Sequence, residues 1–200
     1  MQSLKWTYFY TRLAKNPTFY GLESASNEEI ETYLEKLVNL AVFRLKEAGC
    51  LTLSKPDQLQ TTLEGRIASE NYLSYKTLQR MKSYIKQGVT VSDLIKNVAN
   101  AEEFKGLPVR HNEESFNRML ILQVPFKVPK NDLENPHIKA NLLLQSHLER
   151  VPMPVLDYIA DMRHVLEHAY RVLQGAALVS ANQGFLDSTL NIIYLQQMLI

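Results

Sequence analysis

The chain has 200 residues, 46% hydrophobic and 22% charged, which is ordinary for a globular protein of one large or two small domains. Its 22 basic and 21 acidic residues give a formal net charge of +1, so the composition shows no general electrostatic attraction to nucleic acid. The single cysteine, Cys50, excludes an internal disulfide and a cysteine zinc cluster, and it fits a reducing compartment.

The sequence shows no targeting or membrane segment. No apolar run approaches the ~18 residues of a membrane span, and no signal peptide opens the chain. We therefore expect a nuclear and/or cytoplasmic protein that is neither secreted nor membrane-bound. Met1 runs almost directly into a helical pattern, and Ile200 closes the chain without a cap, so we also expect a piece of a larger protein.

Two helices are predicted near the N-terminus. An aromatic-rich helix covers Leu4–Lys15 and ends before a proline. Ser26 and Glu29 form a capping-box pattern that opens a second helix, which continues to Ala48.

A β-hairpin is predicted to follow these helices. Short alternating runs at 50–53 and 58–62 flank a turn-rich tip at 54–57. Two helices followed by a hairpin are the outline of a winged-helix unit with its wing. Residues 1–62 are therefore predicted to form a winged-helix-like domain.

The remainder, residues 63–200, is predicted to be a helical bundle. Helical periodicity, N-cap residues and glycine or proline stops divide it into helices joined by short loops. The predicted fold class is therefore mainly α, with a winged-helix-like unit and a small β-hairpin ahead of a bundle around one long helix. The predicted helices cover Leu63–Lys86, Thr90–Asn100, a segment that Asn112 caps, Asn135–Arg150, Pro154–Asn182 and Phe185–Ile200.

The long helix, Pro154–Asn182, is predicted to organise the bundle. It would extend about 39 Å over roughly 26 residues. Its apolar stripe, expected to be buried, is Val155, Ile159, Met162, Leu166, Ala169, Leu173 and Ala176. Two polar series at the same spacing, expected on the opposite side, are Asp157, Asp161, His164, His168 and Arg171, and Arg163, Glu167, Tyr170 and Gln174.

The polar side of this helix holds the candidate nucleic-acid contacts. Arg163, His164, Arg171 and Gln174 follow one side and can reach phosphates and base edges. The plainer interpretation is a face that only meets water. Aromatic side chains can also stack on bases, but the N-terminal set has helical spacing, which favours a core position: Trp6, Tyr8, Phe9, Tyr10, Phe19 and Tyr20.

Motifs of known catalytic sites are absent from the sequence. It has no GxxxxGK[ST] phosphate loop and no GxSxG, HExxH or CxxC. We expect no catalytic residue, metal site or cofactor in this chain itself. His164 and His168 would hold a metal only with a third ligand such as Asp161, and we favour solvated or hydrogen-bonded histidines.

A cluster of polar residues follows Pro108. A catalytic role for Arg110, His111 and Glu113 lacks a nucleophile and an oxyanion partner. We favour a helix start capped by Asn112, with Arg110 paired to a carboxylate.

Six stretches, in order, resemble one family. They are WTYFYTRLAKNPTFYGL, LEGRIASENYLSYKTL, GLPVRHNEE, NPHIKANLLLQSHLER, DYIADMRHVLEHAYRVLQGA and ANQGF. Together they resemble the C-terminal part of a helicase cassette of the Ski-two-like superfamily-two RNA and DNA helicases, over nearly the whole chain. Within this family the resemblance points to the two-cassette enzymes, namely the helicase subunit of the activating signal cointegrator complex and the spliceosomal helicase that unwinds paired snRNAs. The meiotic crossover helicases are a more distant option.

The resemblance implies a layout and a division of labour. Residues 1–62 would be the winged-helix domain that braces two RecA-like ATPase domains. Residues 63–200 would be the helical-bundle, or ratchet, domain of the Sec-sixty-three homology unit. ATP and Mg would be cofactors of the full-length helicase and not of this chain. The long helix would lie across the channel for single-stranded nucleic acid.

The resemblance also implies roles for single residues. Arg171 and Gln174 stand at the Arg-x-x-Gln positions of the family's ratchet helix. His164 lies two turns earlier on the Arg171 side, and Arg163 is a fourth candidate. Arg110, His111 and Glu113 match the PVRH-x-E segment and would form an interdomain brace.

Two functions remain open. In the first, the chain braces the RecA-like domains and guides single-stranded RNA or DNA along the long helix. In the second, it is a docking module for other subunits of a splicing or cointegrator-type complex. The near-zero net charge favours docking, whereas the stripe through His164, Arg171 and Gln174 favours strand guidance. A translocon component that shares the homology fits less well, because no membrane segment is present.

Overall fold

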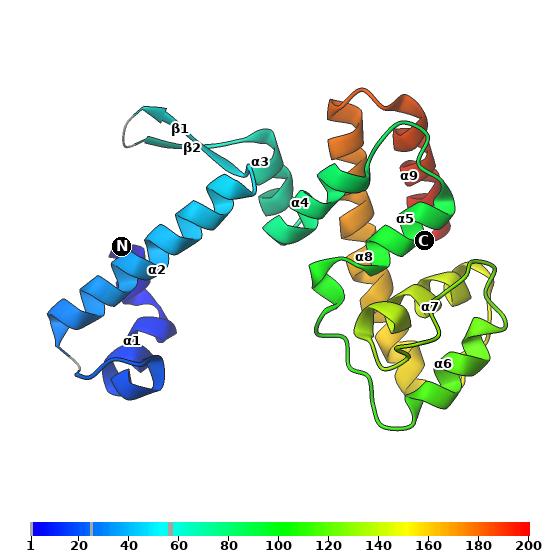
Figure 1. Ribbon diagram of the computed structural model, residues 1–200, viewed down its shortest axis with the longest axis horizontal. Helices are drawn as coiled ribbons and strands as arrows, with labels where there is room; N and C mark the ends of the chain where they lie inside the picture. Colours follow the sequence, from blue (N-terminus) through cyan, green and yellow to red (C-terminus); the bar gives the residue numbers. More distant parts are fainter. Residues whose placement is uncertain (1, 25, 56–57) are drawn as a thin grey trace.

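The computed structural model describes residues 2–24, 26–55 and 58–200. An elongated N-terminal part lies beside a bundle of helices (Figure 1). Within the described residues the secondary structure is helical apart from one two-stranded antiparallel sheet. The predicted fold class, a mainly α chain with a small hairpin ahead of a bundle, is confirmed.

The N-terminal part has a small core of its own. Helix α1 (Tyr8–Lys15) lies between two 3-10 turns, η1 (Gln2–Trp6) and η2 (Pro17–Tyr20), and packs on the first turns of α2 (Asn27–Glu47). Its fully buried residues are Leu13, Ile30 and Leu34.

The N-terminus of α2 is capped, although the capping box is incomplete. The Ser26 hydroxyl accepts the Glu29 N–H at 3.3 Å, as predicted. The Glu29 carboxylate accepts the N–H of Ser24 at 2.9 Å and not that of Ser26. The Glu29 carboxylate therefore holds Ser24, in the loop before the helix, which the motif does not predict.

The hairpin consists of β1 (Leu51–Lys55) and β2 (Gln58–Thr61). Leu51 lies opposite Thr61, and Leu53 lies opposite Leu59. The predicted pairing is confirmed, with β1 shifted toward its tip. Residues 56 and 57 of the predicted tip lie outside the described residues.

The hairpin joins the bundle through a single residue, Thr62. Its hydroxyl accepts the Gly65 N–H at 3.1 Å, which caps α3 (Leu63–Glu70), and donates to the Gly49 carbonyl at 2.7 Å. A Cβ on Gly65 would lie 2.1 Å from the Cys50 carbonyl oxygen, so the glycine lets the hairpin lie directly on α3.

The bundle is built around one long helix. This helix, α8, packs against helices that precede and follow it in the sequence, and it contacts α9 most extensively (Figure 1). No helix in the described part of the chain has both the length and the apolarity of a membrane span. The remaining helices are α4 (Tyr75–Tyr84), α5 (Val91–Ala99), the 3-10 turn η3 (Glu102–Phe104), α6 (Glu113–Ile121), α7 (Pro136–Leu148), α8 (Leu156–Asn182) and α9 (Leu186–Met198).

The single helix predicted over residues 63–86 is wrong. The structure divides it into α3 and α4 at a turn in which Tyr72 has a φ of 53°. The Asn71 amide donates to the Ile67 carbonyl at 2.9 Å and closes α3, while Ser74 caps α4. Both side chains compete with a continuous helix for backbone groups, which periodicity alone does not reveal.

The turn between α3 and α4 approaches α8 closely. A Cβ on Gly175 would lie 2.5 Å from Cδ1 of Leu73. A glycine in the middle of α8 therefore admits the α3–α4 corner into the core.

Candidate nucleic-acid interface

Helix α8 carries all four predicted nucleic-acid contacts. It has 27 residues and extends about 40 Å at 1.5 Å per residue. The predicted apolar stripe is buried at Ala169, Leu173 and Ala176. It is wrong in the first turn, where Val155 is exposed and Tyr158 is buried instead.

The four candidate residues share one face of α8. Arg163 and Gln174 are eleven residues apart, so they differ by about 20° around the helix, as do His164 and Arg171. Arg163, His164 and Gln174 are exposed, whereas Arg171 is partly buried. The line from Arg163 to Gln174 is about 16 Å long. We call these four residues the α8 face.

Arg171 is the most constrained residue of the α8 face. Its Nε is buried and has no hydrogen-bond partner among the described residues. A buried donor without a partner is costly, and an outside ligand could reach this nitrogen only if the side chain moved.

Two neighbours modify the chemistry of the α8 face. Glu167 is exposed between the candidates and offsets one of the two arginine charges. Tyr170, 37% exposed, offers a ring on which a base can stack. The face therefore combines weak positive charge with stacking and hydrogen bonding.

His164 lies against His168, one turn further along α8. The two rings are 4.1 Å apart between centroids, and Nδ1 of His168 lies 2.9 Å from the His164 carbonyl oxygen. Burial and the neighbouring His168 lower the pKa of His164. His164 is therefore mostly neutral at pH 7 and acts as a hydrogen-bonding group rather than as a cation.

A metal at this histidine pair would need a third ligand. Within residues 2–24, 26–55 and 58–200, no group of three His, Cys, Asp or Glu side chains has a metal-binding arrangement. Asp161, the third ligand considered from the sequence, turns away from the pair to bind two cations.

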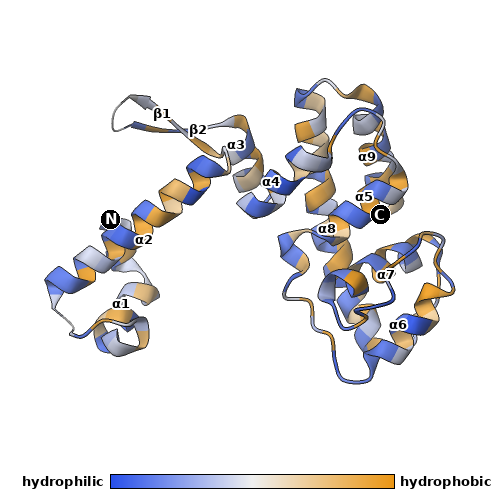
Figure 2. Cartoon of the chain, in the orientation of Figure 1, coloured by the Kyte–Doolittle hydropathy of each residue, from blue (hydrophilic) through white to orange (hydrophobic). Residues whose placement is uncertain are grey.

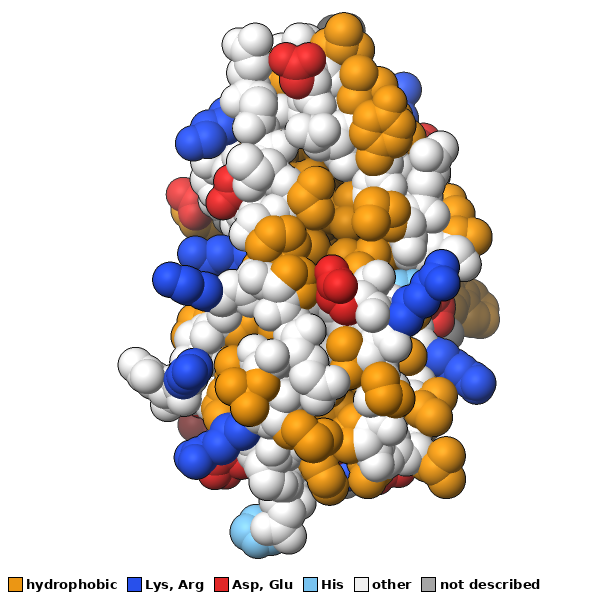
Figure 3. Space-filling model, turned by 90° about the vertical axis from the view of Figure 1, so that its right-hand side faces the viewer, with side chains coloured by type: hydrophobic (Ala, Val, Ile, Leu, Met, Phe, Trp, Pro, Cys, Tyr) orange, Lys and Arg blue, Asp and Glu red, His pale blue; other side chains and the backbone are white. Residues whose placement is uncertain are grey.

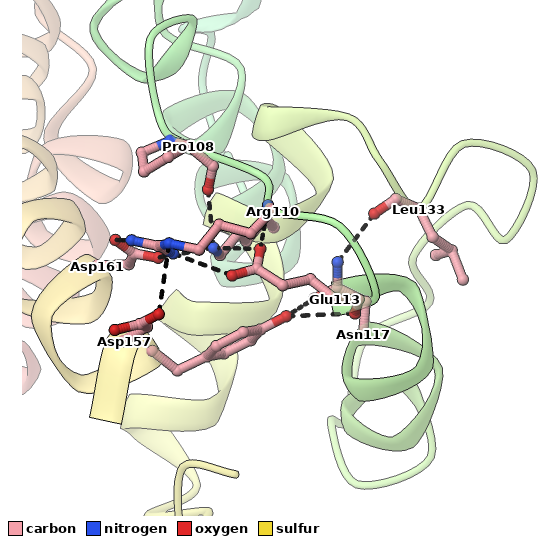
Figure 4. A network of polar contacts seen from close by, with 9 residues as sticks. Pro108, Arg110, Glu113, Asn117, Leu133, Asp157 and Asp161 are labelled. Carbon is pink, nitrogen blue, oxygen red and sulfur yellow. Dashed lines mark hydrogen bonds and ion pairs between the residues drawn. The ribbon is translucent and has the colours of Figure 1, made fainter. Parts of the chain in front are cut away.

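Asp161 belongs to a buried ion network that joins three helices (Figure 4). Nζ of Lys139, on α7, donates at 2.6 Å to Asp161 and at 2.6 Å to Glu113 of α6. Arg110 NH1 donates to Asp161 at 2.6 Å and to Glu113 at 3.0 Å. Nε of Arg110 lies 3.4 Å from Asp157.

Burial makes this network strong. The Lys139 side chain is 0% exposed, and those of Glu113 and Asp161 are 5% and 8% exposed. Burial alone would raise the pKa of Asp161, but hydrogen bonds from Arg110 and Lys139 outweigh it and lower that pKa. Hydrogen bonds to Asp161 and Glu113 raise the pKa of Arg110. Both carboxylate and guanidinium therefore stay charged across the physiological range.

A second set of hydrogen bonds continues from the network into the loop before α7. The Tyr158 hydroxyl donates to the Asn117 side chain at 2.9 Å, and the Asn117 amide donates to the Leu133 carbonyl at 2.8 Å. Lys139 Nζ also lies 4.6 Å from the centroid of the Tyr158 ring. These bonds tie the first turns of α8 to α6.

The residues predicted as a brace have different surroundings. Arg110 and Glu113 bond within residues 61–200, so a contact to other domains stays a prediction. His111 is exposed.

Asn112 precedes α6 with a φ of 72° and makes no side-chain cap, so the predicted cap is wrong. The Glu113 carboxylate instead accepts the Arg110 N–H at 3.0 Å.

Lys139 is the network residue that sequence reasoning missed. One signal was present, because Lys139 lies on the same side of its helix as Leu142, Leu143 and Ser146, all of which are buried. A lysine in such a position needs a carboxylate partner, but its partners lie 26 and 22 residues away in the chain.

Comparison with known proteins matches both parts of the chain. Residues 1–55 match a winged helix-turn-helix domain, and residues 61–200 match the Sec63 Brl domain family. An ATP-dependent RNA helicase of Arabidopsis thaliana, DExH14, is 40% identical over 98% of the chain. Activating signal cointegrator 1 complex subunit 3 of Homo sapiens is 37% identical over 98%, and the human U5 small nuclear ribonucleoprotein 200 kDa helicase is 30% identical over 98%.

The chain spans 9% of the length of each of these relatives. The resemblance to the C-terminal part of a Ski-two-like helicase cassette is thereby confirmed. The Sec63 match covers the whole helical bundle, with the α8 face inside it, and the winged-helix match covers the part before it. The chain therefore belongs to the Sec63 Brl domain family of helicase-associated regions, with a winged helix-turn-helix domain ahead of the Sec63 region.

Proposed function

We propose that this chain is a non-catalytic part of an ATP-dependent RNA or DNA helicase. Its α8 face guides single-stranded nucleic acid, and its N-terminal part braces the RecA-like domains of the same protein. ATP and Mg are bound by those domains. The relatives are long enough to contain them, because this chain spans only 9% of their length. The protein would act in the nucleus and/or the cytoplasm, as a subunit of a larger complex.

The α8 face carries this proposal. Four side chains suited to phosphates and base edges project from one rigid helix, which the bundle holds along much of its length. Rigid placement matters because a translocating strand must meet the same contacts at every step. The partly buried Arg171 adds a guanidinium group, whose charge suits a phosphate.

The apolar surface of α2 and the hairpin supports the bracing role. Leu40 and Phe43 on α2 are 48% and 57% exposed, and Leu53 and Leu59 on the hairpin are 49% and 47% exposed. Figure 2 shows that hydrophobic residues recur along the C-terminal half of α2. Exposed apolar area of this kind marks an interaction surface.

A hollow lies beside this surface, where the hairpin meets the bundle. It has a volume of about 440 Å³, and its apolar lining includes Leu45, Leu51 and Leu73. A hydrophobic side chain of a bracing domain would fit there.

The alternative function, a docking module for other proteins, is favoured by a different surface. On α9, Leu186, Tyr194 and Met198 are 69%, 58% and 57% exposed. Figure 3, which views the bundle side of the molecule, shows hydrophobic side chains along the middle of that side. Docking there is compatible with strand guidance on α8.

Fluorescence anisotropy with a labelled single-stranded RNA and the matching DNA tests strand guidance. We expect salt-sensitive binding by this chain, and we expect Arg171→Ala with Gln174→Ala to weaken it about tenfold or more, by loss of a charged contact and an amide contact. Circular dichroism checks that the fold is intact.

The matched control removes the same two residue types elsewhere. Arg118→Ala with Gln123→Ala changes exposed residues at the end of α6 and should leave binding unchanged. Equal affinities of the two double variants, or no binding at tens of micromolar, would count against strand guidance and favour the docking function.

A further inference from the structure

The ion network lies immediately before the α8 face. Asp161 is three residues, about 4.5 Å along the axis, ahead of His164 on the same helix. The network also includes Asp157, in the first turn of α8. The helix that carries the nucleic-acid candidates thus begins with two carboxylates, which alone would repel phosphate.

We propose that Arg110 and Lys139 are positioning residues for the α8 face, an inference that rests on the proposed function of that face. They act in two ways. They fix the rotation of α8 against α6 and α7, and they compensate two of the three carboxylate charges in the network ahead of His164. Neither residue needs to touch the strand.

The contacts of Lys139 show how the rotation is fixed. Its three ammonium protons have three acceptors, namely Asp161 at 2.6 Å, Glu113 at 2.6 Å and the Pro108 carbonyl at 2.8 Å. These acceptors belong to α8, to α6 and to the extended segment before α6. A fully buried, fully bonded cation allows α8 only one rotation. Rotation of α8 would also move His164 and Arg171 off the exposed side.

The charges show how far the carboxylates are compensated. Glu113, Asp157 and Asp161 contribute three negative charges, and Arg110 and Lys139 contribute two positive charges. Without Arg110, the excess negative charge at the start of α8 would double. The Arg110 side chain is 40% exposed, so it is also the cation that an approaching strand would sense.

The network lies within electrostatic reach of the α8 face. Asp161 and Glu167 raise the pKa of His164, while burial, His168 and Arg171 lower it. His164 therefore reports on whether the charge of Asp161 is compensated.

The first test is an NMR titration of the histidine rings in this chain. In Arg110→Gln, the pKa of His164 should rise measurably, because the Asp161 charge is less compensated. Arg110→Lys should restore the wild-type value. Arg118→Gln, which breaks a surface pair with Glu114, and His147, on the far end of α7, serve as controls.

The second test is strand binding by anisotropy. Arg110→Gln should weaken binding about two- to fivefold at low salt, the difference should shrink as salt rises, and Arg110→Lys should rescue it. A purely structural role would instead give a loss that salt does not reduce and that lysine does not rescue in both assays.

The two tests separate the inference from the proposed function. If wild type binds and depends on Arg171 and Gln174, but Arg110→Gln leaves both His164 and affinity unchanged, the positioning role is wrong and strand guidance stands. If wild type does not bind, strand guidance fails, and an unshifted His164 would then also reject the electrostatic link. Because the Arg110 side chain is partly exposed, its variants should fold even where a Lys139 variant does not.

Discussion

A buried lysine with two carboxylate partners is the strongest single-residue feature of this chain. Replacing an entire buried ion pair by apolar groups is often tolerated, but removing one partner leaves the others uncompensated. Lys139 is the only cation of the network that is wholly shielded from water, since Arg110 reaches the surface. The cost of losing Lys139 is therefore larger than for any surface lysine in the described part of the chain.

Lys139→Met should lower the free energy of unfolding by about 3–5 kcal/mol, since the side chain keeps its volume but leaves Glu113 and Asp161 with one cation. Urea denaturation followed by circular dichroism measures this. The control, Lys105→Met, removes a lysine that is 71% exposed and should change stability by about 0.5 kcal/mol or less. Equal losses for the two variants would show that the network does not stabilise the fold.

The ends of the elements depend on short-range polar contacts, and the sequence predicts many of them. Thr90 caps α5 by accepting the Asp93 N–H at 3.2 Å, and Asn135 caps α7 by accepting the His137 N–H at 2.9 Å, both at predicted helix starts. The prediction of a helix cap failed where the side chains bind other segments of the chain. Asn112 makes no side-chain cap, and the next side chain, Glu113, binds the Arg110 N–H of the preceding loop and Lys139 of α7.

Gly65→Ala tests the contact between the hairpin and α3. An added Cβ would lie 2.1 Å from the Cys50 carbonyl oxygen, so α3 or the hairpin must move. We expect a loss of about 1–3 kcal/mol, although alanine favours helix more than glycine does. Gly106→Ala is the control, because a Cβ there meets nothing within 4 Å. Thermal unfolding measures the stability of both variants. A Gly65→Ala variant more stable than the wild type would contradict the close packing of the hairpin on α3.

At the scale of the molecule, the two parts differ in how much they bury. The bundle has one extensive core with contributions from α8 along much of its length, whereas the small core between α1 and α2 is built on Leu13, Ile30 and Leu34. The N-terminal part leaves large apolar side chains of α2 exposed. This imbalance fits the proposed role of a brace between other domains.

Leu40→Glu with Phe43→Glu should leave the thermal stability of this chain nearly unchanged, because both side chains are exposed. The same pair should abolish association with the RecA-like domains of the helicase, because it places two charges in an apolar contact. Size-exclusion chromatography of the mixed proteins measures this. Glu35→Ala with Lys46→Ala, exposed polar residues of α2, should associate normally. Unchanged association of the Leu40 and Phe43 variant would reject α2 as the bracing surface.

The sequence by itself determined most of the local structure and the family of this protein. Local patterns depend only on residues that are close in the sequence, so they can be predicted from it. They include the helix periodicity, caps such as Ser26 and the alternation on either side of residues 54–57. The tertiary structure decided which charges are buried. Glu113, Lys139 and Asp161 lie on three helices and are 26 and 22 residues apart in the chain, so their pairing exists only when α6, α7 and α8 pack together. For the same reason the polar residues of α8 fall into two groups. Asp161 is buried in the ion network, whereas the α8 face lies on the solvent side.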